Sequence, residues 1–349
     1  MSELHLDSLE IKNFRCFEHL TIEKLGRVNL IVGKNSVGKT ALLEGLWLLT
    51  SGARWPIIHK ILYDRNDLVI YNMPWQSSKS LQQDAIQSFF SGRPKLFPQS
   101  FEIALGDLVF NFAVIDIFGD NIEIRYMPNT IICKDNISTF PDLPQKDFLE
   151  YEVIEQSKKS KTVFIPLKGL TWQAVSTYWD DIALTDKEEE ITTCLKLLDP
   201  LTTRFTSKGE NMQDRVRYSV VKTGRFPDPV PLANLGEGIQ RIFAMALAMS
   251  TASNGYLLID EFETGLYHNV QADVWRAIFK LAHDWNIQVF ATTHSWDCVE
   301  AFQEAAAEDE NEEAMLIRLQ HKRSGDGIEA VLYDEELLAK ATRQQVEVR

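Results

Sequence analysis

The chain has 349 residues, of which 45% are apolar and 25% charged, and its formal net charge is −14. These values are typical of globular proteins that bury a sizeable core, and they argue against disordered, collagen-like and membrane classes. The negative charge argues against a surface that is basic throughout, as duplex-binding proteins usually have, but a local basic groove stays open.

The N-terminus and the cysteines favour a cytoplasmic protein. The N-terminus lacks the basic start and apolar run of a signal peptide, and no uncharged stretch reaches membrane-spanning length. The four cysteines lie far apart, without the spacing of a zinc site or a disulfide framework. We therefore expect reduced thiols, a cytoplasmic location and no membrane contact.

Strands and a helix are predicted in close succession at the start of the chain. Apolar residues alternate over 4–11, and a continuous apolar run covers 28–32. Apolar residues at helical spacing then fill 40–49, directly after a glycine-rich turn. This order predicts two early strands, the second of which leads through the turn into a helix.

The middle and end of the chain predict different architectures. Short runs joined by Gly-Asp turns predict an antiparallel β lobe with strands at 101–105, 108–118 and 122–126. Helices are expected at 172–184 and 188–198, and without sustained heptads they form a compact arm rather than a coiled coil. From residue 232 onward helices alternate with apolar strands at 256–259 and 287–291, as in a parallel sheet covered by helices.

A phosphate-binding loop is predicted between the strand at 28–32 and the following helix. The eight residues match GxxxxGK[ST]: Gly33, Lys34, Asn35, Ser36, Val37, Gly38, Lys39 and Thr40. Glycines let successive N–H groups point at phosphate oxygens, and the helix start adds partial positive charge. Lys39 is expected to reach the β- and γ-phosphates and Thr40 to ligate Mg²⁺, so the motif predicts binding of ATP with Mg²⁺.

Two carboxylates end the strand at 256–259. Asp260 is expected at the carboxyl edge of the sheet, where it can hold Mg²⁺, and Glu261 can orient and deprotonate the attacking water. In isolation such a pair is also explained by a solvated turn, but together with the phosphate loop it favours catalysis.

Two further features fall on the same side of the predicted sheet. His294 follows the next strand, where its imidazole can hydrogen-bond the γ-phosphate, although a histidine at a strand end is often structural. The segment 234–241 opens an amphipathic helix, and a helix start with glycines can bind an anion.

In this order the motifs resemble those of ABC-type ATPases, more narrowly the RecF, SMC and OLD-like branch of AAA-type P-loop ATPases. Agreement covers 11–17, the phosphate loop, 235–241, 260–268 and 293–295. The resemblance implies an α/β fold: an ATPase head with a mainly parallel core sheet, an antiparallel β lobe and a helical insert. It places the discontinuous head at 1–50 and 230–349, and the insert at 51–229.

The same resemblance assigns residue roles. His294 corresponds to the switch histidine, and Asn13 and Arg15 lie near the nucleotide. The signature helix would contact the nucleotide of a second head, which implies a homodimer, through Leu235, Gly236, Glu237, Gly238, Gln240 and Arg241. Gly236 stands where the family has serine, so backbone N–H groups, and Gln240 or Arg241, would make this contact. No glutamine is assigned as the Q-loop.

Three functions are compatible with these features. The favoured one is an ATP-hydrolysing switch or motor in DNA maintenance or anti-phage defence, with DNA and a separately encoded effector as candidate partners. The alternative is an ATP-gated scaffold with little turnover. A nuclease is disfavoured, because only about fifty residues follow His294 and the TOPRIM domain of OLD-like nucleases needs more.

Overall fold

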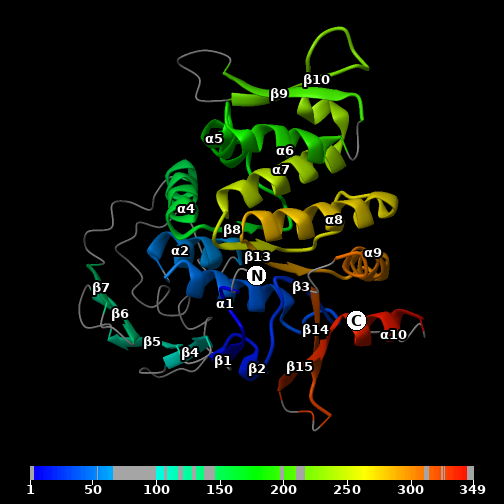
Figure 1. Ribbon diagram of the computed structural model, residues 1–349. Helices are drawn as coiled ribbons and strands as arrows, with labels where there is room; N and C mark the ends of the chain where they lie inside the picture. Colours follow the sequence, from blue (N-terminus) through cyan, green and yellow to red (C-terminus); the bar gives the residue numbers. More distant parts are fainter. Residues whose placement is uncertain are drawn as a thin grey trace.

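A computed structural model describes most of the chain (Figure 1). The described residues are 4–52, 54–65, 100–105, 108–116, 121–127, 131–136, 146–196, 200–209, 217–309, 314–323, 325 and 327–343. Among the helices in these ranges, none combines the length and apolar character needed to cross a membrane.

A six-stranded sheet forms the centre of the molecule. Its spatial order is β15 (Ile328–Tyr333), β14 (Ala314–His321), β3 (Val28–Val32), β13 (Gln288–Thr292), β12 (Tyr256–Ile259) and β8 (Thr162–Ile165). Every neighbouring pair is parallel except β14 and β15, which are antiparallel. The predicted mainly parallel core sheet is thereby confirmed.

Both faces of the central part of this sheet are covered, which explains why its inner strands are largely apolar. Leu257 and Ile259 pack on one side into the larger core, and Leu258 packs on the other side into a second core. The larger core is covered by helices α7 (Glu237–Thr251), α8 (His268–Asp284) and α9 (Trp296–Ala306). Helix α1 (Lys39–Thr50) covers the opposite face (Figure 1).

A second sheet is antiparallel throughout and forms the predicted β lobe. Its order is β2 (Phe17–Ile22), β1 (Leu9–Phe14), β4 (Ser100–Leu105), β5 (Leu108–Asp116), β6 (Asn121–Met127) and β7 (Ile131–Asn136). The first strand begins at Leu9, later than the alternation predicts. Leu6 instead exchanges two backbone hydrogen bonds with the Gln288 side-chain amide, at 2.9 and 2.8 Å, so its polar groups are satisfied outside a strand.

Besides β4 to β7, the described part of the segment 51–229 contains helices, two strands of a small sheet and one core strand. Within the described residues its helices are α2 (Trp55–Asp64), α4 (Lys146–Ser160), α5 (Trp172–Ile182) and α6 (Asp186–Leu195). Strands β9 (Thr202–Gly209) and β10 (Arg217–Thr223) form the small antiparallel sheet with β11 (Val230–Pro231), which directly follows the segment. Helix α5 begins at Trp172 as predicted but ends at Ile182 rather than at 184, and α6 covers Asp186–Leu195 rather than the predicted 188–198. The segment also supplies β8, an edge strand of the core sheet, a contribution that the sequence did not reveal.

The carboxyl ends of β3, β13 and β12 lie side by side, because these three strands are parallel neighbours. The loops that follow them therefore meet at one edge of the sheet. The chain is completed by a short 3₁₀ helix at Leu232–Leu235, before α7, and by α10 (Glu335–Arg343).

Candidate nucleotide site

The glycine-rich loop after β3 is tightly packed against its surroundings. A Cβ atom on Gly38 would lie 2.5 Å from Cys16 Sγ and 2.8 Å from Phe17 Cζ, and the φ angle of Gly38 is +97°. Gly38 also precedes the first turn of α1, which contains no acidic residue. The positive end of the helix is therefore directed at the loop, and the helix itself contributes no acidic side chain there.

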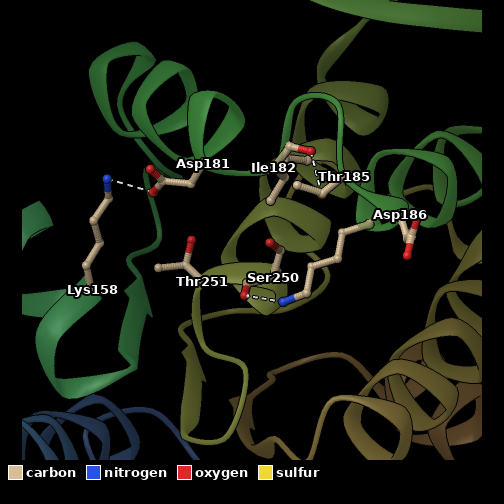
Figure 2. Close-up of a pocket in the computed structure, with 8 residues that line it drawn as sticks. Lys158, Asp181, Ile182, Thr185, Asp186, Ser250 and Thr251 are labelled. Atoms are coloured by element: carbon tan, nitrogen blue, oxygen red, sulfur yellow. Dashed lines mark hydrogen bonds and ion pairs between the residues drawn. The ribbon is translucent and has the colours of Figure 1, made fainter.

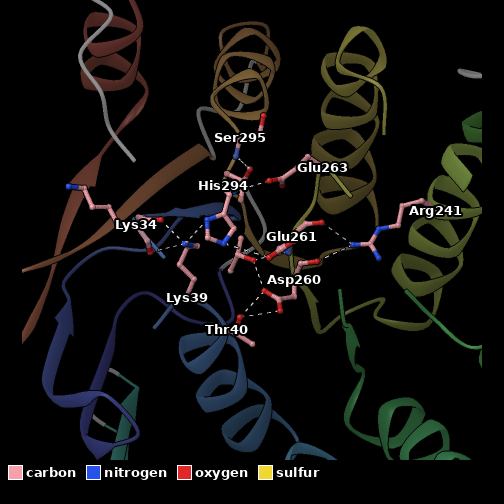
Figure 3. Close-up of polar contacts among 12 residues, drawn as sticks. Lys34, Lys39, Thr40, Arg241, Asp260, Glu261, Glu263, His294 and Ser295 are labelled. Carbon is pink, nitrogen blue, oxygen red and sulfur yellow. Dashed lines mark hydrogen bonds and ion pairs between the residues drawn. The ribbon is translucent and has the colours of Figure 1, made fainter. Parts of the chain in front are cut away.

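Lys39 is buried inside this loop, with 5% of its surface exposed. Its Nζ donates to the carbonyls of Gly33 and Lys34, at 2.6 and 3.1 Å, and lies 3.2 Å from Nδ1 of His294. Burial lowers the pKa of Lys39, while nearby carboxylates act in the opposite direction. The ammonium group is thus held between the loop and the histidine that follows β13 (Figure 3).

A hydroxyl and a carboxylate face each other where α1 meets the end of β12. Thr40 Oγ1 lies 3.2 and 3.1 Å from the two carboxylate oxygens of Asp260. Thr292, the last residue of β13, donates from its hydroxyl to Asp260 Oδ1 at 2.7 Å. Hard oxygen donors of this kind suit Mg²⁺, which binds proteins through one or two carboxylates and completes its shell with substrate phosphates and water.

Glu261 has a left-handed backbone, with φ of 48°. Such a conformation costs a non-glycine residue about 1–3 kcal/mol and persists only where surrounding contacts enforce it. Here the N–H of Glu261 donates to Thr292 Oγ1 at 2.9 Å, and the N–H of Phe262 donates to the Thr292 carbonyl at 2.9 Å. These two hydrogen bonds therefore hold the turn after β12 against the end of β13.

His294 connects the two halves of the site. Its Nε2 lies 3.6 Å from Oε1 of Glu261, while Nδ1 faces Lys39. The backbone N–H of His294 donates to Oε1 of Glu263 at 2.8 Å. One side chain thus spans the distance from the phosphate loop to the carboxylate pair (Figure 3).

Of the residues at the start of α7, Arg241 contacts the turn that carries Asp260 and Glu261, and the others named below lie apart from it. Gly236 has φ of 100°, and a Cβ atom there would meet no atom of the described residues within 4 Å, so the helix start is open to its surroundings. Glu237 is exposed, and Gln240 Nε2 donates to the Gly236 carbonyl at 3.3 Å. Arg241 instead is buried, with 7% of its surface exposed, and its guanidinium points to the end of β12 (Figure 3).

The turn between β1 and β2 approaches α1 from the other side. Asn13 and Arg15 both have left-handed backbones, with φ of 55° and 53°. Arg15 Nε lies 3.2 Å from Oε2 of Glu44, whose Oε1 accepts from Arg65 Nε at 2.7 Å. The buried Glu44 carboxylate thereby fixes the turn to the helix that carries the phosphate loop, a connection that the sequence did not indicate.

A separate cavity of about 470 Å³ lies away from the phosphate loop (Figure 2). It is lined by Lys158, Asp181, Ile182, Thr185, Asp186, Lys187, Ser250 and Thr251. Lys158 Nζ is 2.6 Å from Asp181 Oδ2. Lys187 Nζ donates to the Ser250 carbonyl at 3.1 Å and lies 4.8 Å from the Trp285 ring centroid. Both cations already have partners, so this cavity is a poor anion site.

Two family models match the chain where the site residues lie. The description "AAA ATPase domain" matches residues 5–135, and "AAA domain, putative AbiEii toxin, Type IV TA system" matches residues 180–297. Together with the core sheet and the converging motifs, these matches identify the chain as a P-loop ATPase with AAA-type domains. The protein accordingly binds nucleotide and hydrolyses ATP.

Relatives agree with this class over different shares of the chain. An "ATP/GTP phosphatase" of Helicobacter pylori is 23% identical over 87% of this chain and 89% of its own length. The replication and repair protein RecF of Clostridioides difficile is 45% identical, but over only 14% of this chain and 13% of RecF. An SMC head bound to the C-terminal winged-helix domain of ScpA shares the fold, with a TM-score of 0.54 at 13% identity, covering 97% of this chain and 99% of that one.

Proposed function

We propose that ATP binds with its phosphates along the loop of residues 33–40 and that Lys39 contacts the β- and γ-phosphates. The burial of Lys39 supports this role, because a desolvated ammonium group gains more from phosphate oxygens than from neutral carbonyls. The positive end of α1, whose first turn contains no acidic residue, also favours binding of the negatively charged phosphates. Asn13 and Arg15 remain our candidates for contacts near the base or sugar.

Thr40 and Asp260 are the proposed Mg²⁺ ligands. Their facing oxygens, 3.1 and 3.2 Å apart, support this assignment. A bound Mg²⁺ would neutralise charge on the β- and γ-phosphate oxygens. The contribution of the chain itself is to hold the hydroxyl and the carboxylate in place, with Thr292 orienting Asp260.

Glu261 is the proposed general base, and His294 the proposed γ-phosphate contact. The observation that carries this proposal is the convergence of Lys39, His294 and Glu261 in one connected set of contacts from three different loops. A carboxylate beside the phosphates can accept the proton of an attacking water, and His294 lies between the two.

Replacing Glu261 by Gln tests this mechanism against the scaffold alternative. Because the amide cannot accept the proton, E261Q should lose about 10²–10⁴-fold in kcat while its affinity for Mg·ATP changes little. K39A is the matched binding variant and should lose ATP affinity instead. Phosphate release and equilibrium nucleotide binding separate the two effects. Unchanged turnover in E261Q would show that Glu261 is not the general base. If E261Q loses turnover but keeps wild-type function in the cell, the ATP-gated scaffold is favoured instead.

The exposed start of α7 is the proposed contact for the nucleotide of a second head. Backbone N–H groups at an open helix start suit an anion, and Gly236 leaves room for close approach. The residues assigned to this contact are Leu235, Gly236, Glu237, Gly238 and Gln240. Arg241 is buried, and its guanidinium donates to carbonyls of its own chain.

At the level of the cell we propose a role in DNA maintenance or anti-phage defence, with a separately encoded effector. The local similarity to RecF supports the first, and the family description that names an AbiEii toxin supports the second. The ScpA domain bound by an SMC head is a precedent for a partner protein. ATPase rates measured with and without duplex DNA test the DNA role, which unchanged rates would contradict.

A further inference from the structure

Arg241 connects helix α7 to the ends of two core strands. Its Nη2 donates to the carbonyls of Asp260 and Glu261, at 3.0 and 3.2 Å, and its Nη1 donates to the Pro166 carbonyl at 3.2 Å. Pro166 follows β8, and the two acidic residues follow β12. One buried guanidinium therefore bonds three carbonyls at the edge of the sheet where the phosphate loop lies. Figure 3 shows it directed at Asp260 and Glu261.

Two of these carbonyls, those of Asp260 and Glu261, belong to the constrained turn that follows β12. Glu261 is left-handed, and hydrogen bonds from both sides enforce this conformation. On one side Thr292 accepts from the Glu261 N–H at 2.9 Å, and on the other Arg241 donates to the Glu261 carbonyl. The direction of the Glu261 side chain depends on its backbone, so both partners help to aim its carboxylate.

We propose that Arg241 is a positioning residue for ATP hydrolysis, which fixes the backbone of Asp260 and Glu261 so that the Glu261 carboxylate is held in its catalytic orientation. This inference rests on the proposed role of Glu261 as the general base. In this role Arg241 contacts neither the nucleotide nor the attacking water, and it acts only through the carbonyls of Asp260 and Glu261. The inference also replaces the expectation, drawn from the sequence, that Arg241 contacts the phosphate of a second head.

The chemistry of the side chain explains why arginine occupies this position. A planar guanidinium has five N–H donors in a rigid fork, so it can bond carbonyls from two strands at once. Lysine would place one ammonium group on a flexible stem and could not reproduce this geometry. Arg241 also lies one turn after the open start of α7, so the same bonds tie that helix start to the turn of Glu261.

Replacing Arg241 by Gln in the full-length protein tests the proposal. R241Q should lower kcat by about 10- to 100-fold, since a small misplacement of a reacting group costs about this much. The KM and Kd for Mg·ATP should change less than about threefold, because the phosphate loop is untouched. R276Q is the matched control: Arg276 is a half-buried arginine on α8 that pairs with Asp273, Glu304 and Glu308, and its loss should leave kcat unchanged.

A double-mutant cycle with E261Q separates positioning from a general structural effect. If Arg241 acts through Glu261, R241Q should reduce the residual rate of E261Q by less than about twofold, because the group it positions is already inactive. An equal reduction in both backgrounds would overturn the proposal. Unfolding midpoints of all variants are measured in parallel.

The outcomes distinguish this inference from the function on which it rests. Wild-type turnover in E261Q would defeat the role of Glu261 itself. Loss of turnover in E261Q together with wild-type kcat in R241Q would defeat the inference alone. If R241Q does not fold, R241K retains the charge and the aliphatic stem. Its kcat should fall below wild type at unchanged ATP affinity, and a wild-type kcat in folded R241K would equally overturn the proposal.

Discussion

Thr292 shows how much of the site depends on single polar atoms. Its hydroxyl donates to Asp260 Oδ1 at 2.7 Å and accepts from the Glu261 N–H at 2.9 Å. The residue is fully buried, so water cannot replace its bond to Asp260. The sequence predicts the two acidic residues, but a threonine at the end of a strand looks like any other strand residue, and its role follows only from the neighbouring strand.

We therefore predict that T292V destabilises both the fold and the site. Valine has nearly the same shape but leaves the Glu261 N–H without its partner and removes the shorter of the two hydroxyl contacts of Asp260 Oδ1, at a cost of about 1–3 kcal/mol in the free energy of unfolding. The ATPase rate should fall as well, because the turn that carries Glu261 loses its hydrogen bond to the Thr292 hydroxyl. Urea unfolding and ATPase rates measure the two effects. T292S keeps the hydroxyl and should lie close to wild type; equal losses in T292S and T292V would contradict this account.

At the scale of elements, the sequence predicts strands and helices better than it predicts their neighbours. The apolar run at 28–32 is strand β3, and the helix after the phosphate loop is α1. Strand β8 has only four residues and lies among helices and loops of the middle segment, so periodicity does not assign it to the core. It joins the core sheet because β12 offers a parallel edge, and the Asp260 N–H donates to the Ile165 carbonyl at 2.9 Å.

The close approach of β8 and β12 gives a prediction about Gly255. A Cβ atom there would lie 2.1 Å from the Lys161 carbonyl oxygen, so G255A must push the two strands apart. We expect a loss of about 1–3 kcal/mol, as for overpacked cores, measured by urea unfolding. G224A is the control, because its nearest neighbour would lie at 3.6 Å, an ordinary contact. Wild-type stability in G255A would argue against this packing.

At the scale of the molecule, the residues of the candidate nucleotide site come together within one chain, but the start of α7 faces away from them. The phosphate loop, the carboxylate pair and His294 converge within one chain, whereas the start of α7 opens outward, since a Cβ atom on Gly236 would meet none of the described residues within 4 Å. The expected head and insert division of the chain stays a prediction, as does the homodimer. A second copy would supply an anion to this open helix start.

Dimerisation is predicted to depend on nucleotide. With Mg·ATP, E261Q should have twice the monomer mass in light scattering, because unhydrolysed ATP would bridge two heads, and with ADP it should be monomeric. K39A, which should not bind ATP, serves as the control and should remain monomeric with either nucleotide. A monomeric E261Q at saturating Mg·ATP would contradict the contact proposed for the start of α7.

By itself the sequence determined the class of this protein, because the phosphate loop and the Asp-Glu strand end are local patterns whose chemistry depends on a few adjacent residues. Only the tertiary structure decided which side chains complete the site. Arg241, Thr292 and Glu263 act through backbone groups of distant segments, and no spacing along the chain encodes such contacts. Their roles arise because parallel strands bring separate loops to one edge, where buried polar groups must find partners.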